Sequence, residues 1–290
     1  MPRSALALFA ACLLAACASA PVEVAAPRAP PAPPAPKPAP RDEATAAAIE
    51  RVLAGEHRSA DNRARDEYRH PLDTLLFFGI KPDMTVVEVW PGAGGWYTEV
   101  LAPLLAERGK LYAAMTPPMP DNAYVTAALK SFTDKLAARP DLYGRVEVTS
   151  LGPGKFAIAP PGSADLVVTF RNVHNWMNLG FTPEAFAEIH RALKPGGILG
   201  VVDHRADPAK PQDPRAINGY VNEEFAIALI EAAGFELLAR SPINDNPRDT
   251  RDYQQGVWAL PPNYRSGNRD RAKYQEIGES DRFTLKFRKR

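Results

Sequence analysis

From residue 72 to the C-terminus, apolar residues follow two different periodicities in turn. Continuous apolar runs predict strands that are buried on both faces, as in a parallel sheet. Apolar positions spaced three and four residues apart predict an amphipathic helix after most of these strands. The repeated strand–helix order predicts an α/β fold with a doubly wound, Rossmann-like sheet. The expected strands cover residues 84–90, 110–115, 145–150, 164–170, 197–203 and 235–239.

Polar and turn-forming residues mark the ends of these predicted elements. Thr182 is the expected N-cap of one helix, because Pro183 suits a first helical position and Glu184 faces the positive helix end. Alternating apolar residues over 282–289 predict one more strand at the C-terminus. Residues 242–281 are too many for a plain connection, so we expect them to wrap the surface or cover the functional site.

Two helices are expected before the sheet, over residues 42–71. Apolar residues at helical spacing predict the first helix. Ser59 is the expected N-cap of the second, which should stop at His70 because a proline follows it. The charged residues of this second helix are typical of a solvated face. The alternative is a lid that turns Arg69 or His70 toward the functional site.

The first 20 residues have the pattern of an export signal. Arg3 precedes an apolar run over residues 5–16, which is shorter than the roughly 20 residues that span a bilayer. Residues 14–17, Leu-Ala-Ala-Cys, resemble the bacterial lipobox. This resemblance implies a lipoprotein-type signal peptide over residues 1–17 and lipidation of Cys17. The alternative is ordinary cleavage after Ala20 and free secretion, which the proline at the next position disfavours.

Proline and alanine dominate residues 18–41, which predicts an extended linker that buries no core. With a lipid at one end and a domain at the other, the linker would act as a tether. Its alternative role is that of a ligand for a proline-binding domain. The lipoprotein resemblance, with Ala18 after the cysteine, implies a protein of the bacterial cell envelope that faces the periplasm and is attached to the outer membrane only through its lipid.

Composition narrows the chemistry of the remaining chain. Lysine and arginine nearly balance aspartate and glutamate, and a formal charge of +1 gives no reason to expect a nucleic-acid partner. Small molecules are the expected partners. Both cysteines, Cys12 and Cys17, lie in the first 20 residues. The rest of the chain therefore has no thiol for a disulfide, a nucleophile or a zinc site.

A glycine-rich turn follows the first predicted strand. Residues 86–100, VVEVWPGAGGWYTEV, place an acidic residue on the strand and glycines before the next helix. Glycine lets a ligand approach the backbone, and free N–H groups at a helix N-terminus bind anions. This stretch resembles the first motif of class I S-adenosylmethionine-dependent methyltransferases. The resemblance implies that the cofactor is bound by Glu88, Trp90, Gly92, Gly94, Gly95 and Thr98.

Two further stretches resemble the same family. Residues 165–177 resemble its fourth strand and the following loop, and residues 188–204 resemble its helix–LKPGG–strand element. The three stretches have the family's order across a core of residues 72–240. The resemblance implies one methyltransferase-like domain over 42–290, with a cap and a last strand over 241–290. Its sheet would be mostly parallel, with the C-terminal strand antiparallel and inserted between the fifth and sixth strands.

The sequence departs from the family where adenosine is usually bound. Trp90 replaces the first glycine of the motif, and Met115 ends the second strand where an acidic residue normally binds the ribose. The loop over 150–155 also has no acidic residue to meet the adenine amine. The Trp-Pro-Gly variant of the motif is similar to that of a group of exported bacterial predicted methyltransferases.

Several polar residues follow the strands whose carboxyl ends would form the site. Imidazole accepts a proton near neutral pH, so His174 and His204 are the candidate catalytic residues. The alternative role of Asp203 is structural, as a hydrogen-bonding residue at the end of its strand. The alternative role of Trp176 is to cover the edge of the core. The two histidines with Asp203 would also suit a metal ion, but nothing in their spacing requires one, and no metal is predicted. The candidate substrate-binding residues are Arg171, Asn172, Asn175, Trp176 and Asp203.

Together these features predict an exported, membrane-tethered methyltransferase that uses S-adenosylmethionine on a small or lipid-like substrate. The alternative is a non-catalytic envelope protein that binds a ligand in the same fold, which the missing adenosine contacts favour. The chain has no Gly-x-Ser-x-Gly sequence, which excludes an α/β-hydrolase of the usual type.

Overall fold

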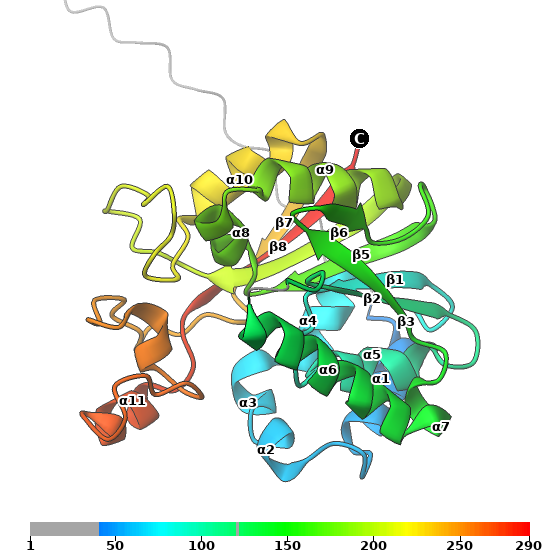
Figure 1. The fold of residues 1–290 in the computed structure, drawn as a ribbon, viewed down its shortest axis with the longest axis horizontal. Helices are drawn as coiled ribbons and strands as arrows, with labels where there is room; N and C mark the ends of the chain where they lie inside the picture. The colour runs from blue at the N-terminus through cyan, green and yellow to red at the C-terminus, as the bar shows by residue number, and fades with distance from the viewer. Residues whose placement is uncertain (1–40, 120–121) are drawn as a thin grey trace, which may run out of the picture. The chain divides into compact units, whose positions relative to one another are not determined.

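Residues 41–119 and 122–290 are described by a computed structural model, and Figure 1 shows their fold. The predicted signal peptide, its lipidation site Cys17 and residues 18–40 of the predicted linker lie outside the described residues. The centre of the fold is an eight-stranded sheet with the strand order β4-β3-β2-β1-β5-β6-β8-β7. Its strands are β1 (Thr85–Val89), β2 (Lys110–Met115), β3 (Glu147–Gly152), β4 (Lys155–Ala157), β5 (Ala164–Phe170), β6 (Leu193–His204), β7 (Phe235–Ser241) and β8 (Arg282–Lys289).

The central strands of the sheet are parallel. Val87 of β1 lies opposite Tyr112 of β2 on one side and Val167 of β5 on the other. β8 lies between β6 and β7 and is antiparallel to both, with Val201 of β6 opposite Leu285. The short β4 is antiparallel to β3. This sheet confirms the predicted fold class, which is Rossmann-like and mostly parallel with an antiparallel C-terminal strand.

Both faces of the central strands are buried, as their continuous apolar sequences predict. Val86 and Val87 of β1 point to opposite sides and belong to two separate hydrophobic clusters. One cluster packs α8, α9 and α10 on one face of the sheet, and the other packs α1, α4, α5, α6 and α7 on the opposite face (Figure 1). These helices are α1 (Glu43–Leu53), α4 (Pro71–Phe78), α5 (Thr98–Leu105), α6 (Ala123–Ala138), α7 (Pro140–Tyr143), α8 (Val173–Leu179), α9 (Thr182–Ala192) and α10 (Glu223–Ala232).

Three predicted strands match the structure at both ends, since β2, β5 and β8 cover the predicted residues. The ends of β1, β3 and β7 differ from the prediction by at most two residues, and β6 begins four residues earlier, at Leu193. α9 begins one residue earlier than predicted, because Phe181 is its N-cap and Thr182 is its first helical residue. Within the part of the chain that the structure describes, none of the helices has the length and apolar character needed to cross a membrane.

The prediction of one helix between Ser59 and His70 is wrong. The segment forms two helices of one turn each, α2 (Ala60–Arg63) and α3 (Asp66–Arg69). Ser59 does cap the first, because its Oγ accepts a hydrogen bond from the Asn62 N–H at 3.2 Å. His70 has a left-handed φ of 42°, and Pro71 then begins α4, which the pattern did not predict. Proline suits the first turn of a helix, where its missing N–H is not needed.

Residues 242–281 form an extension beside the carboxyl end of β6. It contains the 3₁₀ turn η1 (Gly256–Ala259) and α11 (Arg271–Ile277), which share a small apolar cluster of their own. Asp281 connects the end of this segment to its surroundings. Its carboxylate accepts hydrogen bonds from Arg205 at 3.0 Å, from Arg251 at 2.5 Å and from the Asn246 N–H at 2.9 Å. These contacts fix the segment at the start of β8.

Candidate functional site

Two sharp turns lie at the carboxyl ends of the neighbouring strands β1 and β5. Trp90 and Arg171 directly follow these strands, and both have a left-handed φ, of 50° and 63°. Residues other than glycine rarely adopt this conformation, and such residues cluster at functional sites. Backbone hydrogen bonds hold both turns, from Trp90 N–H to the Ala114 carbonyl at 2.8 Å and from Arg171 N–H to the Val202 carbonyl at 2.7 Å. The strained turns therefore mark one edge of the sheet as the candidate site.

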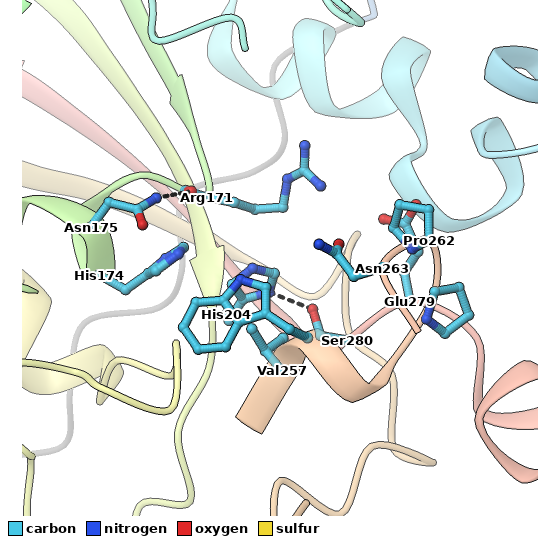
Figure 2. A pocket seen from close by; sticks show the side chains of 11 residues that line it. Arg171, His174, Asn175, His204, Val257, Pro262, Asn263, Glu279 and Ser280 are labelled. Atoms are coloured by element: carbon cyan, nitrogen blue, oxygen red, sulfur yellow. Dashed lines mark hydrogen bonds between the residues drawn. The ribbon is translucent and has the colours of Figure 1, made fainter. Parts of the chain in front are cut away.

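A cavity of about 150 Å³ lies at the carboxyl ends of β5 and β6 (Figure 2). Figure 2 shows His174 and Arg171 on one side of it, and Asn263, Glu279 and Ser280 on the other. The second group comes from the segment over 242–281, which therefore contributes a wall of the cavity. The lining residues are Arg171, His174, Asn175, His204, Val257, Trp258, Pro261, Pro262, Asn263, Glu279 and Ser280.

A buried carboxylate holds His174 in place. The Nδ1 atom of His174 lies 2.9 Å from Oδ1 of Asp203, and its backbone N–H donates to Oδ2 at 3.2 Å. Asp203 is fully buried and also accepts a hydrogen bond from the His204 N–H at 2.8 Å. Because a carboxylate only accepts hydrogen bonds, the neutral His174 ring carries its proton on Nδ1. Its Nε2 atom is then free to accept a proton.

The second histidine, His204, lines the same cavity in its neutral form. Its ring centre lies 5.2 Å from that of His174, and its Nδ1 atom is hydrogen-bonded to Oγ of Ser280. Burial lowers the pKa of His204 well below its usual value, and nearby His174 and Arg171 lower it further. His204 is therefore uncharged at neutral pH.

His174, Asp203 and His204 are also the residues closest to a metal-binding arrangement. One ligand atom of each lies within 4.8 Å of the others. However, both oxygens of Asp203 already accept hydrogen bonds. A metal ion bound to this carboxylate would compete with the contact that orients His174.

Arg171 brings a positive charge to the cavity wall. Its backbone carbonyl accepts a hydrogen bond from Asn175 at 3.4 Å, but its guanidinium has no hydrogen bond or ion pair with any residue in 41–119 or 122–290. Burial lowers the pKa of Arg171 to about 10, with opposing effects from the carboxylate of Glu279 and from neighbouring arginines. Arg171 is therefore still charged at neutral pH.

The glycine-rich turn between β1 and α5 leaves open space at two positions. A Cβ added to Gly92 or Gly94 would meet no atom within 4 Å. Gly95 differs, because a Cβ there would lie 2.9 Å from the Phe132 ring of α6. Gly92 and Gly94 therefore offer free backbone to a ligand, whereas Gly95 is required by packing.

Glu88 and Thr98 form the buried base of this turn. The Thr98 hydroxyl donates to Oε2 of Glu88 at 2.6 Å, and both side chains are buried. Burial raises the pKa of Glu88 to about 7, and the hydrogen bond from Thr98 opposes this increase. In this arrangement Glu88 links β1 to the first turn of α5.

The side of the turn where adenosine is usually bound lacks a polar anchor. The Trp90 indole N–H donates to the Leu151 carbonyl at 2.8 Å, and its ring packs 5.9 Å from the Phe181 ring. Met115, at the end of β2, is buried in the hydrophobic core. The turn thus leaves open space at Gly92 and Gly94, and an apolar side chain rather than a carboxylate ends β2 at Met115.

No family model and no curated protein matches this chain. Solved structures do match it. A SAM dependent methyltransferase from Aquifex aeolicus is 18% identical, with a TM-score of 0.52 over 84% of this chain and 97% of that chain. The [4+2]-cyclase SpnF is also 18% identical, with a TM-score of 0.54 over 81% of this chain and 84% of its own. This chain has the fold of S-adenosylmethionine-dependent methyltransferases.

A longer protein shares this methyltransferase fold. Phosphoethanolamine N-methyltransferase 2 from Haemonchus contortus, solved in complex with S-adenosyl-L-methionine, is 16% identical, with a TM-score of 0.50. The match covers 84% of this chain and 56% of that protein. At such identities the similarity establishes the fold, and the chemistry has to be argued from the site.

Three of the predicted substrate-binding residues do not line the cavity. Asn172 donates from Nδ2 to the Val89 carbonyl at 2.9 Å and so links the ends of β1 and β5. Trp176 is fully buried and packs edge-on against Phe186. Neither residue lines the cavity, and nor does Asp203. Arg171 and Asn175 lie in the cavity wall, and the substrate contacts expected of the other three side chains stay predictions.

The sequence pattern did not indicate seven of the residues that line the cavity, namely Val257, Trp258, Pro261, Pro262, Asn263, Glu279 and Ser280. Val257 and Trp258 lie in the 3₁₀ turn η1, and the others lie in irregular backbone, which has no apolar periodicity. The only sequence signal was the unusual length of the segment over 242–281. The fold brings Ser280 to His204 because β8 pairs with β6, with Arg282 opposite His204.

Proposed function

We propose that this protein is an S-adenosylmethionine-dependent methyltransferase that acts on a small molecule. The observation that carries the proposal is the exposed turn after β1, where Gly92 and Gly94 leave the backbone open to a ligand. The turn leads into α5, and free N–H groups at a helix N-terminus suit the carboxylate of the methionine part. The turn and Trp90 would hold the cofactor, and the cavity at β5 and β6 would hold the substrate.

The residues around the cavity would prepare the substrate for methyl transfer. When bound, S-adenosylmethionine supplies a methyl group attached to a positively charged sulfur. His174 would accept the proton of the substrate's nucleophilic group on Nε2, because Asp203 holds the proton on Nδ1. Uncharged His204 would hydrogen-bond the substrate from the neighbouring strand. A positioned base of this kind contributes roughly 10²- to 10⁴-fold in rate.

The fold alone does not imply methyl transfer, because one structure with this fold is described as a [4+2]-cyclase. Cofactor binding is therefore the test of this proposal. We expect calorimetric titration of the full chain with S-adenosylmethionine to show saturable binding. Gly94→Trp should abolish it, because the indole would occupy space that the protein leaves empty. Leu238→Trp, at a partly exposed position on β7, is the matched control and should bind like the wild type.

A non-catalytic envelope protein that binds a ligand is the second candidate function. Met115 and the packed Trp90 indole favour it, because neither offers the ribose a carboxylate. The same titration separates the two candidates. A folded wild-type chain that binds no S-adenosylmethionine at millimolar concentration would reject the methyltransferase and support the binding protein.

We also propose that the protein is exported and attached by a lipid on Cys17 to the periplasmic side of the bacterial outer membrane. The support is the Leu-Ala-Ala-Cys sequence over 14–17 and the proline-rich linker that follows it. Cys17→Ser should move the protein from the membrane fraction to the soluble fraction of cells. Cys12→Ser removes the other cysteine and should leave the distribution unchanged. A membrane fraction that is the same in Cys17→Ser and the wild type would contradict lipidation.

A further inference from the structure

Four arginines meet around one glutamate beside the cavity. Arg65, Arg69 and Arg282 form ion pairs with Glu279, at 2.6, 3.2 and 2.9 Å. Arg171 lies in the cavity wall close enough for the charges of Glu279, Arg65 and Arg282 to influence its pKa. We call Arg65, Arg69, Arg171 and Arg282 the arginine cluster. Glu279 and Arg171 line the cavity, and the other three arginines contact Glu279 without lining the cavity themselves.

The positive charges of the arginine cluster are not balanced. Among the described residues, Glu279 is the carboxylate that forms ion pairs with the arginine cluster, whereas the nearby buried Asp281 is paired with Arg205 and Arg251. Four guanidinium groups therefore share one paired carboxylate. Both Nη atoms of Arg69, one of Arg65 and Nε of Arg282 are buried without a hydrogen-bond partner. Buried charged donors without protein partners are costly, so this environment favours a negative charge nearby.

The neighbouring ionisable groups respond to this excess of positive charge. Burial lowers the pKa of Arg69 well below its usual value, and Arg171 is the next largest cause. Burial also lowers the pKa of His204, to which Arg171, Arg282 and Arg69 contribute by repulsion. A metal ion at His174, Asp203 and His204 would experience the same repulsion, whereas an anion would be attracted.

We infer that the cavity binds the anionic group of a small molecule, a carboxylate or a phosphate, through the guanidinium of Arg171. This inference names the substrate class for the methyl transfer proposed above and rests on that proposal. A guanidinium presents a planar fork of donors that matches both anions, and Arg171 makes no other side-chain hydrogen bond among the described residues. The rest of the arginine cluster supplies a positive field behind it.

The size and position of the cavity agree with such a substrate. Its volume of about 150 Å³ is below the roughly 300 Å³ at which pockets for drug-sized ligands begin. It therefore suits a small acid or a head group better than a lipid chain. His174 lines the same cavity, so an anion held by Arg171 would keep the nucleophile of the same molecule close to Nε2.

Anion binding can be measured on the full chain without S-adenosylmethionine. Inorganic phosphate and malonate are titrated separately by calorimetry in chloride buffer at constant ionic strength. We expect saturable binding of at least one of them. The anion that binds more tightly indicates whether the cavity prefers a phosphate or a carboxylate. Arg171→Gln should weaken it by about tenfold or more, and Arg171→Lys by less, because it keeps the charge but loses the fork. Arg288→Gln, which removes a half-exposed arginine on β8, should bind like the wild type.

Thermal unfolding separates an anion anchor from a residue needed for packing. Without added anion, Arg171→Gln should be at least as stable as the wild type, because the variant relieves repulsion within the arginine cluster. A large loss of stability with unchanged phosphate and malonate binding would overturn the inference, and so would binding of neither anion. Zn²⁺ binding without anion binding would overturn it in favour of a metal site. Because no cofactor is present, failure here leaves the result of the S-adenosylmethionine titration intact.

Discussion

At the scale of single residues, the buried carboxyl groups of this protein differ in the partners they have. Asp203 accepts hydrogen bonds from three N–H groups, and Asp281 is paired with two arginines. Glu88 has one hydroxyl donor, from Thr98, and no ion pair within the described residues. Burial accordingly raises the pKa of Glu88 to about 7, above the value of 4.5 for a free glutamate. Its ionisation therefore opposes folding.

This shift predicts a pH-dependent stability that Glu88→Gln removes. Below the unfolded-state pKa near 4.5, Glu88 is neutral in both states. As the pH rises toward 7, the unfolded state ionises first, so the free energy of unfolding falls; the loss is complete above 7 and is on the order of 3 kcal/mol. Urea unfolding at about pH 5 and about pH 8 should show Glu88→Gln gaining stability relative to the wild type as the pH rises.

The control for this comparison is Glu184→Gln, which removes an exposed carboxylate. Its difference from the wild type should change little between the two pH values. A difference between Glu88→Gln and the wild type that stays constant with pH would contradict the raised pKa.

At the scale of elements, α4 connects the N-terminal helices to the sheet through a close contact with β6. A Cβ built on Gly200 of β6 would lie 2.6 Å from Cγ of Phe78, at the end of α4. Phe78 is buried in the hydrophobic cluster on this face of the sheet. Glycine in a strand interior often marks such a close approach of a neighbour. The path of α4 over the sheet therefore depends on this one residue.

Gly200→Ala should destabilise the fold because the added methyl group overlaps the Phe78 ring. We expect a loss of about 1–3 kcal/mol in the free energy of unfolding, measured with urea. In a Phe78→Leu background, where the ring is absent, the same substitution should cost much less. Equal effects of Gly200→Ala in both backgrounds would contradict direct packing of Phe78 on β6.

At the scale of the whole molecule, one carboxylate ties the segment over 242–281 to the sheet. Asp281 is buried and bridges Arg205, just after β6, and Arg251, in the middle of the segment. Its backbone N–H donates to Asp249 at 2.9 Å. Since this segment forms a wall of the cavity, the geometry of the candidate site depends on Asp281 although it does not line the cavity.

Asp281→Asn should therefore weaken the whole fold and release the segment. Removing the charge of this buried carboxylate leaves Arg251 without its ion-pair partner, whereas Arg205 keeps Glu223 and Asp245, so we expect a loss of about 3 kcal/mol in the free energy of unfolding. Limited proteolysis should also cut the variant earlier than the wild type within 242–281. The control is Glu236→Gln, which breaks the half-exposed pair with Arg288 and should cost less than about 1 kcal/mol. Similar losses in both variants would contradict the anchoring role of Asp281.

The apolar pattern along the chain is enough to predict the core strands and their order. Strands β2, β5 and β8 cover the predicted residues because each must bury its own apolar pattern. It could not separate the end of one helix from the start of the next at His70, because proline is compatible with both. The left-handed turn at His70 and the helix α4 after it were decided by packing against the sheet.

The candidate site divides in the same way. Arg171, His174 and His204 could be predicted because they follow buried strands, and the carboxyl ends of parallel strands meet at one edge of the sheet. Their partners Glu279 and Ser280 could not be predicted, because irregular backbone carries no periodicity. Only the tertiary structure brings these partners to the cavity, since β8 pairs with β6 and places the residues before it beside His204. The unbalanced charge around Arg171 likewise exists only once distant segments are packed together.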